Sequence, residues 1–108
     1  MNKKEIQILQ PAQQEIMEIV AVHVELAGKQ SAQKLMHKLY KAFGQLAIFS
    51  LSGALSTDKE LCIAGYRMLV IGQYLCIYRV IEDVVYIYHI VHGTMNYPKL
   101  WKKLAKQS

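Results

Sequence analysis

The sequence predicts an α+β fold with an N-terminal strand, a helical hairpin, an antiparallel three-stranded meander and a short C-terminal helix. Two observations carry this prediction. Apolar residues recur at helical spacing between residues 11 and 47, and from about residue 61 the chain is rich in Val, Ile and Tyr. We expect the strands to form one sheet with the helices packed on one face. The 108 residues suffice for one domain and not for two, so we assign 1–108 to a single domain.

The N-terminal half is expected to form one strand and two helices. Lys4–Gln10 alternates loosely in hydrophobicity and reads as a short strand. Pro11–Ala27 has apolar residues at helical spacing, with Gly28 as a natural C-terminal stop. Ser31 is placed to cap the second helix, whose apolar stripe continues to Ala47. The short link between the helices predicts a hairpin.

The C-terminal half is expected to form the meander. Residues 50–60 show little periodicity and are predicted to be a loop. Tight turns at Gly72-Gln73 and Glu82-Asp83 then separate strands at 66–71, 74–81 and 84–92. A final basic segment has apolar residues on one side of a short helix that begins at Pro98.

Strand pairing can be predicted by counting back from the two turns. This sets Arg67 opposite Tyr78 and Arg79 opposite Tyr86, so the two arginines face opposite ways. One face then holds Arg67, Tyr74, Tyr78 and His89. The other face holds Tyr66, Arg79, Tyr86, Tyr88 and His92. A single β-bulge would move His92 to the opposite face.

Several function classes are not indicated. Residues 61–78 are largely apolar, but Arg67 and Gln73 interrupt them, so we predict no membrane span. No secretory signal is visible at the N-terminus, so we expect a cytoplasmic location. Cys62 and Cys76 fit no zinc or CxxC spacing and are expected to be buried thiols. The histidines at 89 and 92 should point to opposite faces of a strand, so we predict neither a metal site nor a cofactor.

The charge of the chain favours an anionic partner. Thirteen Lys and Arg against eight Asp and Glu give a net charge of +5 and a pI near 9.3. Such a balance suits nucleic acid or an acidic protein, and charge alone does not separate the two.

Short motifs follow one another in a fixed order along the C-terminal half. They are Gly65-Tyr66-Arg67, Ile71-Gly72-Gln73-Tyr74, Ile77-Tyr78-Arg79 and Ile90-Val91-His92-Gly93, followed by Tyr97-Pro98. Together with the strand and hairpin before them, they resemble the RelE/ParE superfamily of bacterial type II toxins. The resemblance extends over nearly the whole chain.

The resemblance implies a small toxin that a cognate antitoxin protein keeps inactive. RelE-like members cut mRNA on the ribosome, and ParE-like members poison DNA gyrase. We expect growth arrest by ribosome-dependent mRNA cleavage, without a metal ion. The alternatives are a non-enzymatic inhibitor of gyrase and a degenerate member that only binds its antitoxin. A shared fold does not choose among these activities.

Three residues are candidates for catalysis. Metal-free RNA cleavage needs a base for the 2′-hydroxyl, cations for the developing phosphate charge and an acid for the leaving oxygen. The resemblance implies Arg67 as the phosphate-stabilising cation and His92 as an acid or base. Tyr97 is the third candidate. The alternative for Arg67 is an arginine stacked on tyrosine, and for His92 a hydrogen-bonded histidine at a strand end.

Four further residues are candidates for binding. Arg79 is a second strand cation with the same two interpretations. Lys59 and Glu60, at the end of the predicted loop, would supply a cation and a base, or are ordinary loop charges. Trp101, like Tyr97, would stack on a base or pin the C-terminal segment to the sheet. After the last strand, residues 93–96 stand where many relatives carry Arg or Asp.

Overall fold

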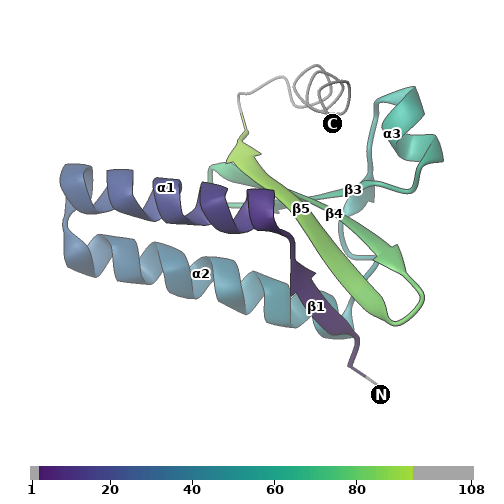
Figure 1. The fold of residues 1–108 in the computed structure, drawn as a ribbon, viewed down its shortest axis with the longest axis horizontal. Coiled ribbons are helices and arrows are strands. Elements are labelled where there is room, and N and C mark those ends of the chain that lie inside the picture. Colours follow the sequence, from purple (N-terminus) through teal and green to yellow (C-terminus); the bar gives the residue numbers. More distant parts are fainter. Residues whose placement is uncertain (1–2, 94–108) are drawn as a thin grey trace.

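A computed structural model of the chain describes residues 3–93. In chain order the elements are β1 (Glu5–Ile8), α1 (Gln10–Ala27), α2 (Lys29–Ile48), β2 (Ala54–Leu55), α3 (Lys59–Ile63), β3 (Arg67–Ile71), β4 (Tyr74–Ile81) and β5 (Val84–His92) (Figure 1). The predicted order of strand, helical hairpin and meander is confirmed. The short helix expected from Pro98, together with Tyr97 and Trp101, lies outside the described residues.

The strands form one five-stranded sheet in the order β1-β5-β4-β3-β2. Strand β1 lies at one edge of the sheet and runs parallel to β5. The other neighbours are antiparallel. Residues 50–60 are not entirely loop as predicted, because they contain β2 and the start of α3. The rest of the predicted α+β layout holds.

The link between α1 and α2 is shorter than predicted. Gly28 has a φ of 89°, a backbone conformation that favours glycine, and α2 begins at the next residue, Lys29. The predicted N-cap at Ser31 is therefore wrong, because the helix has already started there. The Ser31 hydroxyl instead lies 2.8 Å from Nε2 of His23 and joins the two helices.

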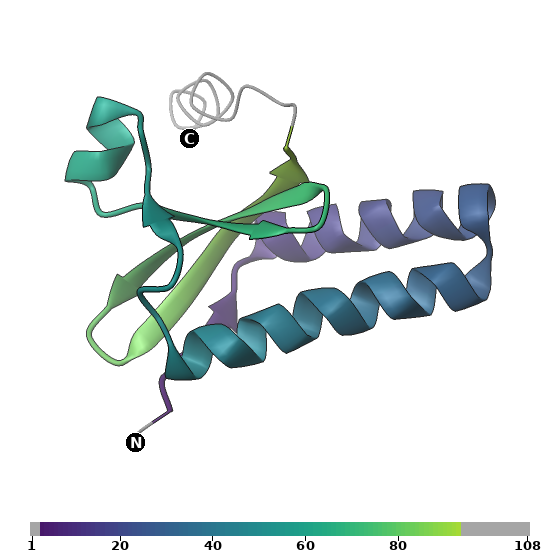
Figure 2. The same ribbon diagram turned by 180° about the vertical axis from the view of Figure 1, so that it is seen from behind.

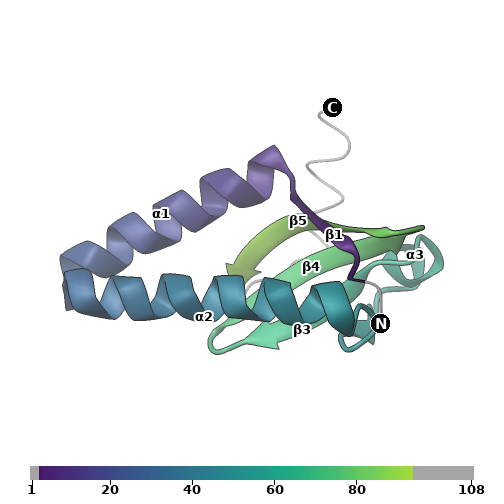
Figure 3. The same cartoon turned by 90° about the horizontal axis from the view of Figure 1, so that it is seen from below.

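Helices α1 and α2 cover one face of the sheet and extend beyond it at the end where they are joined (Figures 1 and 3). The main core lies between them and the strands. Its fully buried members include Ala12, Ile16, Leu39, Phe43 and Leu46 from the helices and Cys76, Tyr78, Val85, Ile87 and Ile90 from the sheet. We call this side of the sheet the covered face.

The short helix α3 packs on the other side of the sheet, far from the α1–α2 link (Figure 2). A smaller cluster lies beneath it, made of Leu61, Tyr66, Ile77 and Val91 with Met68, Leu75 and Tyr88 at its margin. We call this side the open face, because the hairpin does not reach it. Within residues 3–93, no helix has both the length and the hydropathy of a membrane span.

The register of the meander agrees with the prediction as far as Ile87. Arg67 pairs with Tyr78, and Arg79 pairs with Tyr86. Ile87 pairs with Tyr78, and the register changes there. The residue before Tyr78 in β4, Ile77, pairs with His89.

Tyr88 is thus the extra residue of a β-bulge. The bulge puts His92 on the covered face and His89 on the open face, so the predicted grouping is wrong for both histidines. They still point to opposite faces, as expected. Both cysteines are free, Cys76 buried and Cys62 partly exposed.

Candidate functional site

Arg67 begins β3, and its guanidinium turns toward the segment that follows α2. Its Nη1 donates to the carbonyl of Gly53 at 2.7 Å and lies 3.4 Å from the carbonyl of Leu51. The side chain is half-buried. A principal role of this arginine is therefore to hold backbone carbonyls of a loop.

Tyr78, the cross-strand partner of Arg67, holds the same loop from within the core. Its side chain is fully buried, and its hydroxyl donates to the carbonyl of Ser50 at 2.9 Å. The same oxygen accepts the backbone N–H of Gly53 at 2.9 Å. Burial raises the pKa of Tyr78, so the hydroxyl keeps the proton that it donates.

Glycine is required at position 53 because the loop backbone approaches the sheet closely. A Cβ there would lie 2.7 Å from the carbonyl oxygen of Met68 and 2.7 Å from the Tyr78 hydroxyl. Residues 50–53, which we call the anchored loop, are thus fixed by contacts with two sheet side chains and by the absence of a side chain at Gly53.

His92 lies at the opposite end of the meander. It pairs with Tyr74, and the two rings meet edge to face with centroids 5.8 Å apart. His92 is exposed, and Tyr74 lines a shallow pocket against α1 that also involves Glu18 and His23.

The structure does not bring Arg67 and His92 together. Their partners on β4 are Tyr78 and Tyr74, four positions apart (78 − 74). At the rise of a β-strand this separates them by about 13 Å along the sheet. That distance joins backbone positions. In this conformation the Arg67 guanidinium contacts the carbonyl of Gly53 and the His92 ring contacts Tyr74, so each side chain is held by its own neighbours.

Arg79 lies on the open face, where it clamps the chain after α3. Its Nη2 donates to the Tyr88 hydroxyl at 2.7 Å, and its Cζ lies 4.9 Å from the ring centroid of Tyr66. Nη1 reaches the carbonyl of Ala64 at 3.4 Å. Burial raises the pKa of Tyr66, and the positive charge of Arg79 opposes that rise. These contacts agree with the stacked, structural interpretation of this arginine.

Lys59 and Glu60 lie in the first turn of α3 and are exposed. Asp58 caps the helix, because its carboxylate accepts the N–H of Leu61 at 3.1 Å, and Leu61 packs on the open face. The two charges therefore share the side of the sheet that carries Arg79, opposite to Arg67.

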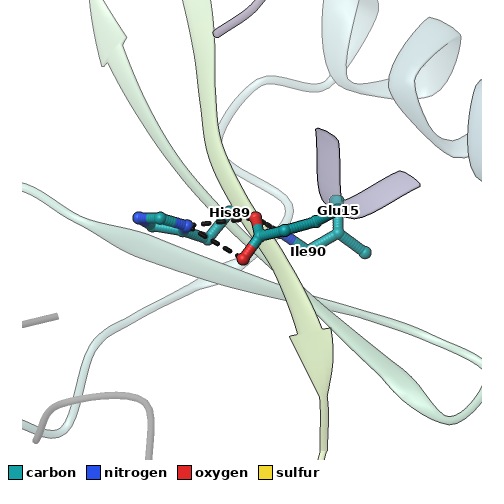
Figure 4. Close-up of polar contacts among 3 residues, drawn as sticks. All are labelled: Glu15, His89 and Ile90. Atoms are coloured by element: carbon teal, nitrogen blue, oxygen red, sulfur yellow. Dashed lines mark hydrogen bonds and ion pairs between the residues drawn. The ribbon is translucent and has the colours of Figure 1, made fainter. Parts of the chain in front are cut away.

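One polar contact was not predicted from the sequence, and it joins α1 to the edge of β5 (Figure 4). Oε1 of Glu15 accepts the backbone N–H of Ile90 at 3.1 Å and lies 3.0 Å from Nδ1 of His89. His89 is 8% exposed. Glu15 stands on a helix otherwise rich in glutamine and glutamate, so nothing in the sequence distinguishes it from its neighbours.

An apolar groove runs along the hairpin and was also missed. It is lined by Ile8, Gln13, Ile16, Met17, Val20, Ala21, Met36 and Tyr40. We call it the hairpin groove. Met36 and Tyr40 belong to the apolar stripe of α2, yet they are 42% and 48% exposed. That stripe is wider than the face that one helix buries. Its width was the feature of the sequence that indicated an exposed apolar surface.

Comparisons with known proteins place this geometry in a family. Residues 6–97 match the family model described as the ParE toxin of the type II toxin–antitoxin system parDE. No curated protein sequence matches the chain.

Two solved structures illustrate the fold. One, from the chromosomal ParDE system of P. aeruginosa, has 18% identity and a TM-score of 0.70, covering 83% of this chain and 96% of that one. The other, from the RelBE2 toxin–antitoxin complex of Mycobacterium tuberculosis, has 21% identity and a TM-score of 0.55, covering 83% and 98%. At these identities the likeness concerns the fold. The family model covers most of the sequence, and the chain therefore belongs to the ParE toxin family of type II toxin–antitoxin systems, within the RelE/ParE superfamily.

Proposed function

We propose that this toxin arrests bacterial growth by inhibiting DNA gyrase in the cytoplasm, without cleaving RNA. The observation that carries the proposal is the position of Arg67. Its Nη1 donates to a loop carbonyl, and it lies about 13 Å along the sheet from His92. Cleavage of a phosphodiester needs its acid, base and cations within hydrogen-bonding reach of one phosphate. Arg67 holds the anchored loop and His92 packs on Tyr74, and these separate contacts support a role other than cleavage.

Ribosome-dependent mRNA cleavage is the second candidate. Lys59, Glu60 and Arg79 share the open face, and Arg79 lies against two tyrosine rings. Such a group offers a cation, a carboxylate and aromatic surface to RNA. It would use a different set of residues from the Arg67 and His92 pair that the resemblance implies.

We further propose that the antitoxin neutralises the toxin by laying an amphipathic helix in the hairpin groove. The groove lining is apolar, and Met17 is 66% exposed at its rim. The helix α2 carries Lys29, Lys34, Lys38 and Lys41 and no acidic residue. An acidic antitoxin segment that folds on binding would complement this charge.

One induction experiment separates the two targets. The toxin is expressed without its antitoxin, and mRNA integrity, DNA integrity and the SOS response are followed together. We expect DNA breaks and SOS induction with intact mRNA, and inhibition of supercoiling by purified gyrase. Co-expression with the antitoxin encoded beside the toxin gene is the control and should restore growth.

The opposite pattern would overturn the gyrase proposal. Codon-positioned mRNA cuts with intact DNA would favour the ribonuclease. In that case Arg67→Ala and Arg79→Ala, compared side by side, would show which arginine supports cleavage. Normal growth at confirmed soluble levels of the protein would contradict toxicity itself.

A further inference from the structure

A second group of exposed apolar side chains lies at the far end of α2 from the link, outside the hairpin groove. Four of them fall within eight consecutive residues, namely Ile48 at 39%, Phe49 at 59%, Leu51 at 63% and Leu55 at 45% exposure. We call residues 48–55 the anchored edge, because they contain the anchored loop and end in the edge strand β2. A soluble monomer gains nothing by exposing such a cluster.

The backbone of the anchored edge is held in place although its apolar side chains are outside. Tyr78 bonds both Ser50 and Gly53, and Arg67 bonds the carbonyl of Gly53. The ends are also tied, by Phe49 N–H to the carbonyl of Gln45 and by Ser56 N–H to that of Tyr66. A surface ordered before binding loses less conformational entropy when a partner arrives. Two sheet side chains thus order a segment whose own apolar groups have no core to fill.

The chemistry of this surface fits a polypeptide better than a nucleic acid. Three of the four exposed side chains are aliphatic, whereas unpaired bases are bound by stacking on aromatic rings. Residues 42–57 carry no acidic residue, and the guanidinium of Arg67 lies beside Leu51 and Gly53, which favours a partner with an acidic rim. Within residues 3–93 no strand pairs with the outer side of β2, so the sheet can accept a further strand there.

We infer that the anchored edge is the surface through which the toxin binds its protein target, at an acidic-rimmed apolar patch of that target. The inference rests on the proposed function in taking the target to be a protein, DNA gyrase, and it assigns a surface separate from the hairpin groove. Arg67 then acts as a positioning residue. It holds the anchored loop in the shape that the target recognises, and it touches no substrate.

The test uses the double variant Leu51→Ser, Leu55→Ser of the full chain. Its matched control is Ile63→Ser, because Ile63 is 77% exposed on α3 and lies on the open face. Two readouts are taken, inhibition of supercoiling by purified gyrase and affinity for the antitoxin encoded beside the toxin gene. We expect the half-inhibiting concentration of the double variant to rise at least about tenfold, as for loss of an interface anchor. Antitoxin affinity and the control should stay unchanged.

A second comparison tests the positioning role of Arg67. Arg67→Ala should weaken gyrase inhibition and leave antitoxin affinity unchanged, whereas the Ile63→Ser control should leave both unchanged. Combined with the double leucine variant, Arg67→Ala should add little further loss, because both act through the same loop. Independent, additive losses would overturn the positioning role.

The remaining outcomes test the inferred surface and the proposed target separately. Undiminished inhibition by the double variant would overturn the inference and leave the gyrase proposal standing. Loss of antitoxin affinity with full inhibition would assign the anchored edge to the antitoxin and also overturn it. If the parent toxin arrests growth but does not inhibit gyrase, the proposed target fails. Loss of growth arrest in the double variant alone would then still support the surface.

Discussion

The two faces of the sheet each carry one strand arginine, and they hold it by different means. On the covered face Arg67 reaches loop carbonyls, beside the fully buried Tyr78. On the open face Arg79 lies against the rings of Tyr66 and Tyr88. Carbonyl dipoles and aromatic ring faces can therefore each accommodate a cation within a strand. Because side chains alternate along a strand, two arginines of one motif set need not belong to one site.

The covered face is less accessible to water than the open face. Its buried Cys76 gives the largest of the expected differences in unfolding free energy. Burial raises the pKa of the Cys76 thiol from 9.0 to about 12. The folded-state value lies above the unfolded one, so this stabilisation is complete below about pH 9 and is lost as pH rises toward 12. Three pKa units correspond to about 4 kcal/mol of unfolding free energy.

Urea unfolding between pH 8 and pH 11 should show about 3 kcal/mol of that loss, because this range covers about two of the three pKa units. Cys76→Ala should remove this part of the alkaline destabilisation, and Cys62→Ala should keep it because the Cys76 thiol remains. The tyrosines and lysines that titrate in this range are common to both variants and cancel in the comparison. An identical alkaline decline in the two variants would contradict the dry environment of Cys76.

One tyrosine from each face gives a second comparison of the two faces, with a smaller expected change in unfolding free energy. Tyr78→Phe removes the hydroxyl that bonds Ser50 and Gly53, and leaves the Gly53 N–H without that partner. We expect a loss of about 1–3 kcal/mol in unfolding free energy and faster amide exchange at Gly53. Tyr86→Phe, on the partly exposed open face, should change stability by less than about 0.5 kcal/mol. Equal effects from both substitutions would mean that the Tyr78 hydroxyl does not hold the anchored loop.

The smallest expected effect lies at the sheet edge where the faces meet. Glu15→Ala removes the carboxylate that accepts the Ile90 N–H. We expect a loss of about 1 kcal/mol and faster amide exchange at Ile90. Glu15→Gln retains a carbonyl acceptor and should preserve most of the protection. Unchanged exchange in Glu15→Ala would show that solvent replaces the carboxylate without cost.

The element order and most of the register of the meander followed from local patterns. Helical spacing, glycine at 28 and the two turns mark boundaries in the chain itself, and pairing across a tight turn needs only counting. The bulge at Tyr88 has no such mark, since neither glycine nor proline stands there. The parallel pairing of β1 with β5 joins segments nearly eighty residues apart, which no local pattern specifies.

The sequence indicated which strand cations need partners, but it did not indicate what those partners are. Arg67 and Arg79 stood out because a cation inside an apolar strand requires a partner. Their partners are backbone carbonyls of the anchored loop and of Ala64, and a backbone atom leaves no trace in a sequence. The anchored edge was missed for a related reason. Exposed leucines look like core leucines until the fold determines which side faces solvent.

The contact between Glu15 and Ile90 also bears on the tendency of the protein to aggregate. Strand β1 ends at Ile8, so the outer margin of β5 continues past its parallel neighbour. There a carboxylate takes the position that the carbonyl of an added strand would need. A negative charge at such a margin discourages stacking of one molecule on the next into fibrils. We therefore expect the toxin, once released from its antitoxin, to stay unaggregated long enough to reach its target.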